Sequence, residues 1–304
     1  MPPGSAASRR TSGSTSESVI GDGDGWVTCA RGHRHWGRYG AAGLLIRTEG
    51  AVVLQHRAPW SHHGGTWGVP GGARDSHETV AAAALREAAE EAGIDADSVR
   101  ITGVHTDDHG GWSYATVLAE PSRQVVTPAS TSAESVEVGW QPVETVDQLP
   151  LHPGFALTWA TLRAAYPPPE LVVDAANVVG SRPDGWWHQR LSAAQRLHGQ
   201  LAVFAESGLE PGSWPQPIRV VGLSWLYPRT TMVVEGEASR LSVPQSPSLR
   251  VVAADGSGDD AIVDVVREHP HAVVVTADRE LRQRVGALGA DVIGPRWFLN
   301  LITD

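Results

Sequence analysis

The segment GGARDSHETVAAAALREAAEEAGI, at residues 71–94, constrains this chain more than any other part of its sequence. Its alanine-rich centre favours an α-helix, and Gly93 is the type of residue that often follows a helix end. Asp75, with Glu78 three residues later, is typical of a helix N-terminus. The sequence therefore predicts a helix that begins near Ser76 and ends just before Gly93.

Three glutamates of this predicted helix share one face. Glu87, Glu90 and Glu91 are spaced i, i+3 and i+4, so their side chains lie within one turn of each other. Adjacent carboxylates repel unless a cation lies between them, and Mg²⁺ binds both carboxylate and phosphate oxygens. Arg86 follows Glu78 by about two turns, so it can hold Glu78 or Glu90 in place. The alternative is a solvated surface helix with ordinary ion pairs, which a glutamate cluster on its own would favour.

The positions around these glutamates follow a longer pattern. After Gly72 come five residues and a glutamate, seven residues and an Arg-Glu pair, then Ala88, a Glu-Glu pair, Gly93 and Ile94. This order resembles the Nudix box, G-x5-E-x7-R-E-U-x-E-E-x-G-U, in which U is a bulky apolar residue and Ala88 is a smaller choice. The preceding HHGGTWGVPGG also resembles the approach to the box in Nudix hydrolases. The resemblance covers residues 36–165.

The resemblance implies an α/β/α sandwich and an enzyme that hydrolyses a diphosphate linked to another moiety with the help of Mg²⁺ or Mn²⁺. It implies that Glu87, Glu90 and Glu91 bind the metal ion, and that the backbone carbonyl of Gly72 is a further ligand. Arg86 and Glu78 become the pair that braces these ligands. The glycines before the helix let the backbone come close to the metal ion and to a phosphate.

The general base and the substrate lie outside this pattern. The base is either Glu91 itself or a loop carboxylate, Glu134 or Glu137. The substrate is a nucleotide-type molecule, a nucleoside diphosphate derivative or a nucleoside triphosphate. Aromatic residues can stack on a nucleobase, although each is more often part of a core. The candidates for stacking are Trp67, Trp112, Tyr114 and Trp140.

Length and composition set the wider limits. With 304 residues and 41% hydrophobic content, the chain can form two domains, each with its own core. A net charge of −10 argues against non-specific nucleic-acid binding as the main role. The single cysteine, Cys29, excludes an internal disulfide, and no apolar run reaches the roughly 18 residues of a membrane span. We therefore expect a cytoplasmic protein that binds no membrane.

The composition also divides the chain. The sequence predicts a disordered Ser/Gly-rich tail at residues 1–25, a Nudix domain at 26–165, a proline linker at 166–169 and a second domain at 170–304. The second domain has β-branched runs ending in acidic residues, such as LVVDAAN and HAVVVTAD, separated by helical segments. This is typical of a parallel sheet with crossover helices, in which sites form at the carboxyl ends of the strands.

Acidic residues at these strand ends form a second candidate site. As isolated residues they are more often helix caps and turn formers. Their order resembles NYN-type members of the PIN-like nuclease superfamily, especially the YacP-like kind. That resemblance implies a Rossmann-like α/β/α domain, a metal-dependent ribonuclease activity and an RNA partner. The implied metal ligands are Asp174, Asp260 and Asp278, with Asn177, Glu235 and Asp259 as supporting residues.

A third group has ligand-type chemistry near the N-terminus. Cys29, His33 and His35 are close in sequence, but three residues do not complete a structural zinc site and the chain has no second cysteine. Further on, HTDDH at residues 105–109 lines either a pocket or a turn.

Together these patterns predict a Mg²⁺-dependent Nudix diphosphohydrolase fused to a PIN/NYN-like ribonuclease domain. The alternative is a Nudix-type ligand sensor that regulates a C-terminal RNA-binding or interaction module. Nudix domains often dimerise, so a homodimer is a further expectation.

Overall fold

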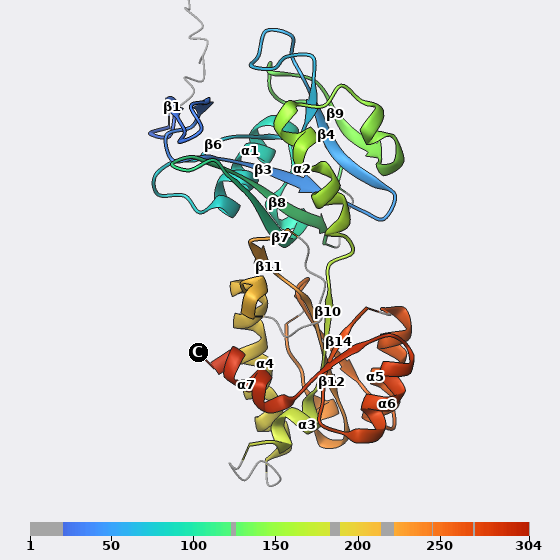
Figure 1. The fold of residues 1–304 in the computed structure, drawn as a ribbon. Coiled ribbons are helices and arrows are strands. Elements are labelled where there is room, and N and C mark those ends of the chain that lie inside the picture. The colour runs from blue at the N-terminus through green and yellow to red at the C-terminus, as the bar shows by residue number, and fades with distance from the viewer. Residues whose placement is uncertain are drawn as a thin grey trace, which may run out of the picture.

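The computed structural model shows two α/β halves, one above the other in Figure 1. We refer to residues 21–165 as the N-terminal half and residues 170–303 as the C-terminal half. The described residues are 21–122, 126–182, 189–213, 222–244, 246–269 and 271–303. Residues 1–20 of the predicted tail lie outside them. No helix in these ranges is long and apolar enough to cross a membrane.

Two sheets form the centre of the N-terminal half. One has the strand order β11-β7-β8-β3-β6 and the other has the order β5-β4-β9. A separate hairpin, β1 with β2, precedes them. The strands are β1 (Trp26–Thr28), β2 (Arg34–Trp36), β3 (Ala41–Ile46), β4 (Ala51–Arg57), β5 (Trp67–Gly68), β6 (Gly71–Ala73), β7 (Val99–Asp108), β8 (Ser113–Pro121) and β9 (Ser135–Pro142). The helices are α1 (Val80–Ala92), α2 (Pro153–Ala164) and the 3₁₀ segments η1 (Ala96–Ser98) and η2 (Val143–Gln148).

Helices α1 and α2 cover opposite faces of these sheets. In β3, Leu44 and Ile46 pack in the core that contains α1, and Leu45 packs in the core that contains α2. Successive strand residues point to opposite faces, which is why the wholly apolar run AAGLLI serves both cores. Helix α1 contributes alanines to its core, whereas α2 contributes larger residues such as Phe155 and Trp159. The arrangement is the α/β/α sandwich that the sequence predicts.

The C-terminal half has one parallel sheet, as predicted. Its strand order is β13-β12-β10-β14-β15, and every neighbouring pair is parallel. Its strands are β10 (Glu170–Asp174), β12 (Arg229–Val234), β13 (Leu249–Ala253), β14 (Val273–Val275) and β15 (Asp291–Ile293). Its helices are α3 (Ala175–Gly180), α4 (Arg190–Ser207), α5 (Gly258–Glu268), α6 (Arg279–Ala287) and α7 (Pro295–Thr303), with 3₁₀ segments η4 (Pro211–Ser213) and η5 (Gly236–Arg240).

Helices cover both faces of this sheet. Helices α3, α4 and α7 pack on one face, and α5 and α6 pack on the other (Figure 1). Counted within this half, the strand order is 3-2-1-4-5, so the order reverses between the first strand, β10, and the fourth, β14. In doubly wound sheets a ligand site forms at such a reversal. The ends of β10 and β14 are therefore the place to look for one.

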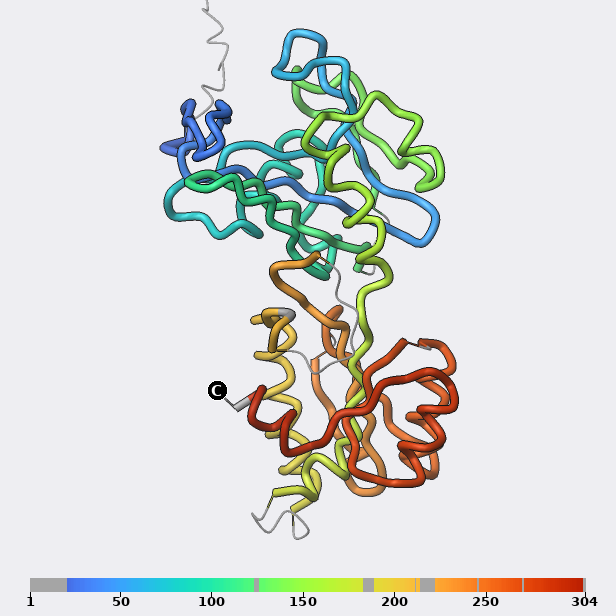
Figure 2. Tube along the Cα trace, viewed as in Figure 1, coloured from blue at the N-terminus to red at the C-terminus, as the bar shows by residue number. Residues whose placement is uncertain are grey.

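One strand of the C-terminal half crosses into the N-terminal sheet. Strand β11 (Trp225–Leu226) pairs antiparallel with β7, opposite Val104 and Gly103. Figure 2 shows this segment reaching up from the C-terminal half to the strands above it. The sequence did not predict this pairing.

A buried charged cluster lies at the same junction. Arg100 donates to Glu120 at 2.9 Å and to the carbonyl oxygen of Tyr227 at 3.0 Å. Arg229, at the start of β12, also pairs with Glu120. Arg100 and Glu120 are buried, so solvent screens the ion pair between them little, and the more exposed Arg229 joins the C-terminal half to this pair.

Helix α1 begins later than predicted. The expected start near Ser76 is wrong, because the N-cap is Thr79, whose hydroxyl accepts a hydrogen bond from the Ala82 N–H. Glu78 does accept from the Asp75 N–H, at 3.0 Å, but within the preceding loop. The end is as predicted, with Gly93 at φ 63° as the C-cap.

Residues 22 and 23 hold that loop out of the helix. The Asp75 carboxylate accepts from the Gly23 N–H at 2.8 Å, and the Ser76 N–H donates to Asp22 at 2.9 Å. These contacts use the groups that would have capped a longer helix. They also give residues 21–25, predicted as part of a disordered tail, specific partners in the fold.

Candidate functional site

Glu91 is the most buried carboxylate of α1. It is 8% exposed and accepts a hydrogen bond from the Gly71 N–H at 2.9 Å. Burial raises the pKa of Glu91, while hydrogen bonds from Gly71 and Gln55 act in the opposite direction. This hydrogen bond connects α1 to β6, the strand that contains Gly71 and Gly72.

Glu87 lies one turn earlier, against the same glycines. Burial raises the pKa of Glu87 to about 7, despite the hydrogen bond that Arg86 donates at 2.8 Å. The nearby carboxylates of Glu91 and Glu90 act in the same direction as burial. A Cβ atom on Gly72 would lie 2.6 Å from the Glu87 Oε1. The Glu87 carboxylate therefore occupies the space that a side chain at position 72 would need.

Arg86 holds the acidic face together. Its guanidinium contacts both carboxylate oxygens of Glu78, at 2.7 and 2.9 Å, and donates to the Ala73 carbonyl oxygen at 2.9 Å. These hydrogen bonds from Arg86 lower the pKa of Glu78. The same guanidinium reaches Glu90 at 3.4 Å. Arg86 therefore connects Glu78 with Glu87 and Glu90 of the acidic face.

Glu90 is the exposed member of the set, with a side chain 61% exposed. Among the described residues, no group of three metal-ligand atoms within 4.8 Å of one another includes Glu87, Glu90 and Glu91 together. Arg86 holds Glu87 and Glu90 while Gly71 holds Glu91. Carboxylate oxygens are nevertheless the donors that a hard divalent cation prefers, and Glu90 has an exposed side chain whose contact with Arg86 is 3.4 Å long. The donor chemistry fits a divalent ion.

Of the two carboxylates predicted to lie on a loop, Glu137 lies instead in strand β9, and Glu134 lies nearer to the helix set. Its charge contributes to the raised pKa of Glu91. Its backbone carbonyl accepts from the Ala58 N–H at 2.7 Å, which fixes the loop. Glu137 is opposite His56 in the β4-β9 pairing and is exposed. The geometry therefore favours Glu134 over Glu137 beside the site.

Sequence reasoning missed two polar residues on β4. Gln55 is fully buried, donates to the Ser135 hydroxyl at 2.6 Å and hydrogen-bonds Glu91. The charge of Arg57 favours the ionised form of Glu91. A single amide inside the apolar strand AVVLQHR was the available signal, because a buried amide needs partners.

The aromatic candidates have structural roles. Trp67 is buried and stacks on His56, with ring centroids 4.8 Å apart. The indole of Trp140 donates to the Val126 carbonyl at 3.1 Å. Burial raises the pKa of Tyr114, whose ring lies near Glu91 and Glu87. Trp112 stacks on His35 at 3.9 Å.

In the C-terminal half, Asp174 ends β10 at the strand-order reversal. It is 8% exposed, and it accepts from the Asn177 N–H at 3.0 Å and from the Thr276 hydroxyl at 2.9 Å. Burial raises the pKa of Asp174, and the charges of Asp259 and Glu235 add to the effect. Asn177 in turn accepts from the Ala277 N–H at 2.8 Å, which ties the ends of β10 and β14 together.

The other acidic residues divide into two groups. Asp278 and Glu235 lie near Asp259, since the charges of both raise its pKa in addition to burial. Each also has a local partner: Asp278 caps α6 by accepting from the Leu281 N–H, and Glu235 accepts from the Gly258 N–H. Asp260 pairs with Arg284 at 2.5 Å and has a side chain 68% exposed. The structure thus brings Asp174, Glu235, Asp259 and Asp278 towards one edge, with Asp260 engaged elsewhere.

The raised pKa of Glu87 predicts a pH-dependent stability. Its pKa rises from 4.5 to about 7 on folding, so its contribution is fully present below pH 4.5 and is lost as the pH rises through 7. Without added divalent ions, the free energy of unfolding should therefore fall over this window, as measured by urea denaturation. Glu87→Gln should flatten the dependence. An unchanged slope in that variant would show that Glu87 is not the titrating group.

The chain is similar to known proteins over part of its length. The NUDIX domain family model matches residues 37–160. A Mycobacterium tuberculosis protein named as an 8-oxo-dGTP diphosphatase is 52% identical over 161 residues, which cover 49% of this chain and 73% of that protein. A Bifidobacterium longum protein named as a nucleoside triphosphate pyrophosphatase/Nudix hydrolase fusion is 41% identical over 156 residues, 49% of this chain and 32% of that protein. The crystal structure of RenU, a Nudix hydrolase from M. smegmatis, is 47% identical and covers 47% of this chain and 94% of its own, with a TM-score of 0.43.

Proposed function

Because this chain belongs to the Nudix family, whose members use divalent metal ions to hydrolyse nucleotide-linked diphosphates, we propose that it is a Mg²⁺-dependent nucleoside triphosphate diphosphohydrolase. The observation that carries the proposal is the complete acidic face of α1, held by Arg86 and by the Gly71 N–H. The names of the M. tuberculosis relatives support an oxidised purine nucleoside triphosphate, of the 8-oxo-dGTP type, as the substrate.

The reaction adds water across a P–O–P anhydride and yields a nucleoside monophosphate and pyrophosphate. Mg²⁺ held by Glu87, Glu90, Glu91 and the Gly72 carbonyl would neutralise the diphosphate charge and acidify the attacking water. Glu134 stands beside Glu91 and is our candidate to take the proton from that water. Arg86 keeps the helix carboxylates oriented through Glu78.

The test is product release by the full chain with Mg²⁺ against a panel of nucleotides: 8-oxo-dGTP, the unmodified triphosphates, ADP-ribose, a nucleoside diphosphate sugar and a dinucleoside polyphosphate. We expect 8-oxo-dGTP to have the highest kcat/KM and to release pyrophosphate. If another compound is hydrolysed with a higher kcat/KM, the proposed enzyme activity stands but the proposed substrate is wrong. Tight binding of a nucleotide with no turnover of any compound would favour the ligand-sensor alternative.

Gly72→Ala should reduce activity with little loss of stability. Its Cβ would meet the far end of the Glu87 side chain, which can move aside but would then leave its place against the backbone. We expect kcat/KM to fall by roughly 10- to 100-fold, which is the usual effect of disturbing the residues that orient a metal ligand. Gly71→Ala is the contrast, because its Cβ would lie 2.5 Å from backbone atoms of Ala42 and Gly43 and should lower the Tm instead. Full activity in Gly72→Ala would show that catalysis does not depend on the position of Glu87 against Gly72.

For the C-terminal half we propose a PIN/NYN-like, metal-dependent ribonuclease site. The convergence of Asp174, Glu235, Asp259 and Asp278 at the strand-order reversal supports it. Asn177 positions the ends of β10 and β14, and Asp260 contributes only if it leaves Arg284.

The double variant Asp174→Asn/Asp278→Asn should abolish cleavage of a single-stranded RNA while nucleotide hydrolysis persists. Retained cleavage would place the activity elsewhere. If the unmodified chain binds RNA without cleaving it, this half is a binding module. A homodimer, the remaining expectation, is checked by light scattering of the same sample.

A further inference from the structure

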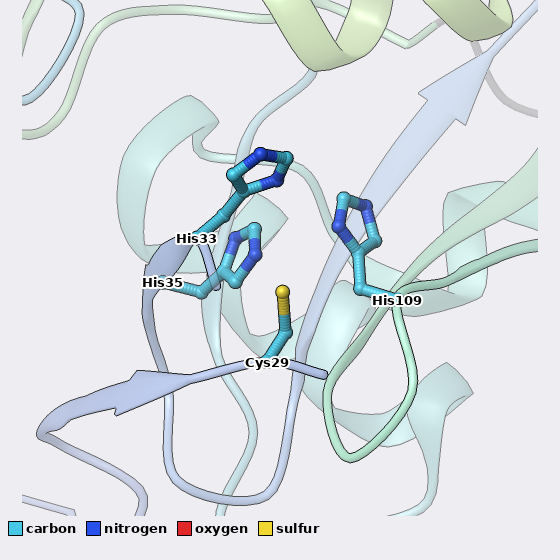
Figure 3. Close-up of side chains that lie close together, drawn as sticks. All are labelled: Cys29, His33, His35 and His109. Atoms are coloured by element: carbon cyan, nitrogen blue, oxygen red, sulfur yellow. The ribbon is translucent and has the colours of Figure 1, made fainter. Parts of the chain in front are cut away.

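Four ligand-type side chains converge outside the acidic face of α1. Cys29 directly follows β1, and His33 directly precedes β2, which contains His35. His109 lies in the turn between β7 and β8. One ligand atom from each lies within 4.8 Å of those of the other three. Figure 3 shows all four side chains directed towards a common space. The residue that the sequence pattern lacked is therefore His109, 80 positions after Cys29.

Buried atoms without partners face this space. The Nε2 atom of His35 and the Nδ1 atom of His109 are buried and have no hydrogen-bond partner. Buried ring nitrogens are normally hydrogen-bonded, so each calls for an explanation. Cys29 is 4% exposed and unpaired. A metal ion would satisfy all three atoms at once.

The outer nitrogen of His109 is already oriented. Its Nε2 lies 2.9 Å from the Asp107 carboxylate, which leaves Nδ1 as the inward atom. A histidine that binds a metal through one nitrogen commonly donates through the other to a carboxylate. His35 is fixed in a different way, by stacking on Trp112 at an interplanar angle of 9°. The orientations of both imidazole rings are thus fixed before a metal ion binds.

The backbone is folded to present Cys29 and His33 together. The Cys29 N–H donates to the His33 carbonyl at 2.9 Å, and the Gly32 N–H donates to the Cys29 carbonyl at 2.9 Å. Gly32 has φ 81°, which suits glycine in such a tight turn. The Ala30 N–H donates to the Gly110 carbonyl at 2.8 Å, so this turn is docked on the loop that carries His109.

We propose that Cys29, His33, His35 and His109 form a structural zinc site. Thiolate and imidazole ligands suit Zn²⁺, whereas Mg²⁺ selects oxygen ligands, so this site is chemically distinct from the acidic face of α1. Tetrahedral zinc places its ligand atoms about 3.3–3.7 Å apart, which lies inside the 4.8 Å within which these four atoms are found. Four protein ligands leave no open position, which makes the role structural.

The ion would fasten the β1-β2 hairpin to the β7-β8 turn. The hairpin follows Asp22 and Gly23, which hold the loop before α1 through Ser76 and Asp75. Zinc would therefore stabilise the segment that shapes the start of the acidic helix. This inference does not depend on which nucleotide the protein hydrolyses.

The first experiment measures metal content in the full chain, produced with zinc supplied and dialysed without chelator. We expect about one zinc per chain, and near zero in Cys29→Ser and in His109→Ala. Asp107→Asn should weaken zinc binding roughly 10- to 100-fold in a chelator competition, because it removes only the outer partner of His109. The control is His62→Ala/His63→Ala, which disrupts a different histidine group, formed with His152, and should keep its zinc.

A second experiment uses only the unmodified protein, so its result does not depend on whether a variant folds. Replacing zinc by Co²⁺ in the unmodified protein should produce the visible absorption of tetrahedral cobalt and a near-ultraviolet thiolate-to-cobalt band. A cobalt spectrum without the thiolate band would remove Cys29 from the site. Absence of bound zinc in the unmodified protein, or zinc lost from His62→Ala/His63→Ala but kept in Cys29→Ser, would overturn the proposal.

Discussion

Replacing Glu90 with glutamine is expected to lower kcat for nucleotide hydrolysis by on the order of a thousandfold or more. Glutamine keeps the size of the side chain but removes the charge that a divalent ion needs. The Glu90 side chain is 61% exposed, and among the described residues its contact is with Arg86, so the fold should not depend on it. Stability should change by no more than about 0.5 kcal/mol, as for other surface substitutions.

The measurement is steady-state kinetics over a Mg²⁺ titration, with the Tm recorded for the same samples. The control is Glu144→Gln, which alters an exposed glutamate in η2 and should retain full activity. Near-normal turnover in Glu90→Gln would remove Glu90 from the set of metal ligands. A fall in activity matched by a large fall in Tm would instead indicate a structural role.

Arg100→Met should produce the largest loss of stability, about 3–5 kcal/mol. Arg100 is 3% exposed and neutralises Glu120, which is 7% exposed, where β7 and β8 meet the C-terminal half. Methionine fills similar space but leaves the buried carboxylate with only Arg229, which is more exposed. Urea denaturation of both proteins gives the difference in the free energy of unfolding.

Two further variants make this result interpretable. Adding Glu120→Leu to Arg100→Met removes the orphaned charge and should recover part of the loss, since a buried ion pair often contributes little net stability. Arg163→Met breaks an exposed pair with Asp147 and should cost less than about 1 kcal/mol. Equal costs for the two single variants would mean that burial of the Arg100 pair is unimportant.

The acidic face of α1 could be predicted because its information is local. The helical repeat alone places Glu87, Glu90 and Glu91 on one face, with Arg86 beside Glu87. The contact between Arg86 and Glu78 depends in addition on the loop before the helix. The helix start could not be predicted in the same way. Thr79 becomes the N-cap because Asp75 and Ser76 are engaged by residues more than 50 positions earlier.

The parallel order of the C-terminal sheet was also predictable, since apolar strands alternated with helical segments. Contacts that depend on tertiary structure were not. His109 joins Cys29 only after β7 and β8 have folded back on the first hairpin. Gln55 on β4 reaches Glu91 on α1 only once this strand and the helix have packed together. The periodicity of the sequence does not predict these long-range contacts.

The pairing of β11 with β7 means that the N-terminal sheet includes a strand from beyond the proline-rich segment. The Ser224 and Tyr227 N–H groups donate to the Val104 and Thr102 carbonyls, extending the cover that β11 gives to β7. A fragment ending near residue 165 would leave that edge bare, and a bare strand edge recruits the edge of another molecule. Oligomers or aggregates of such a fragment would thus report the missing strand rather than a natural assembly.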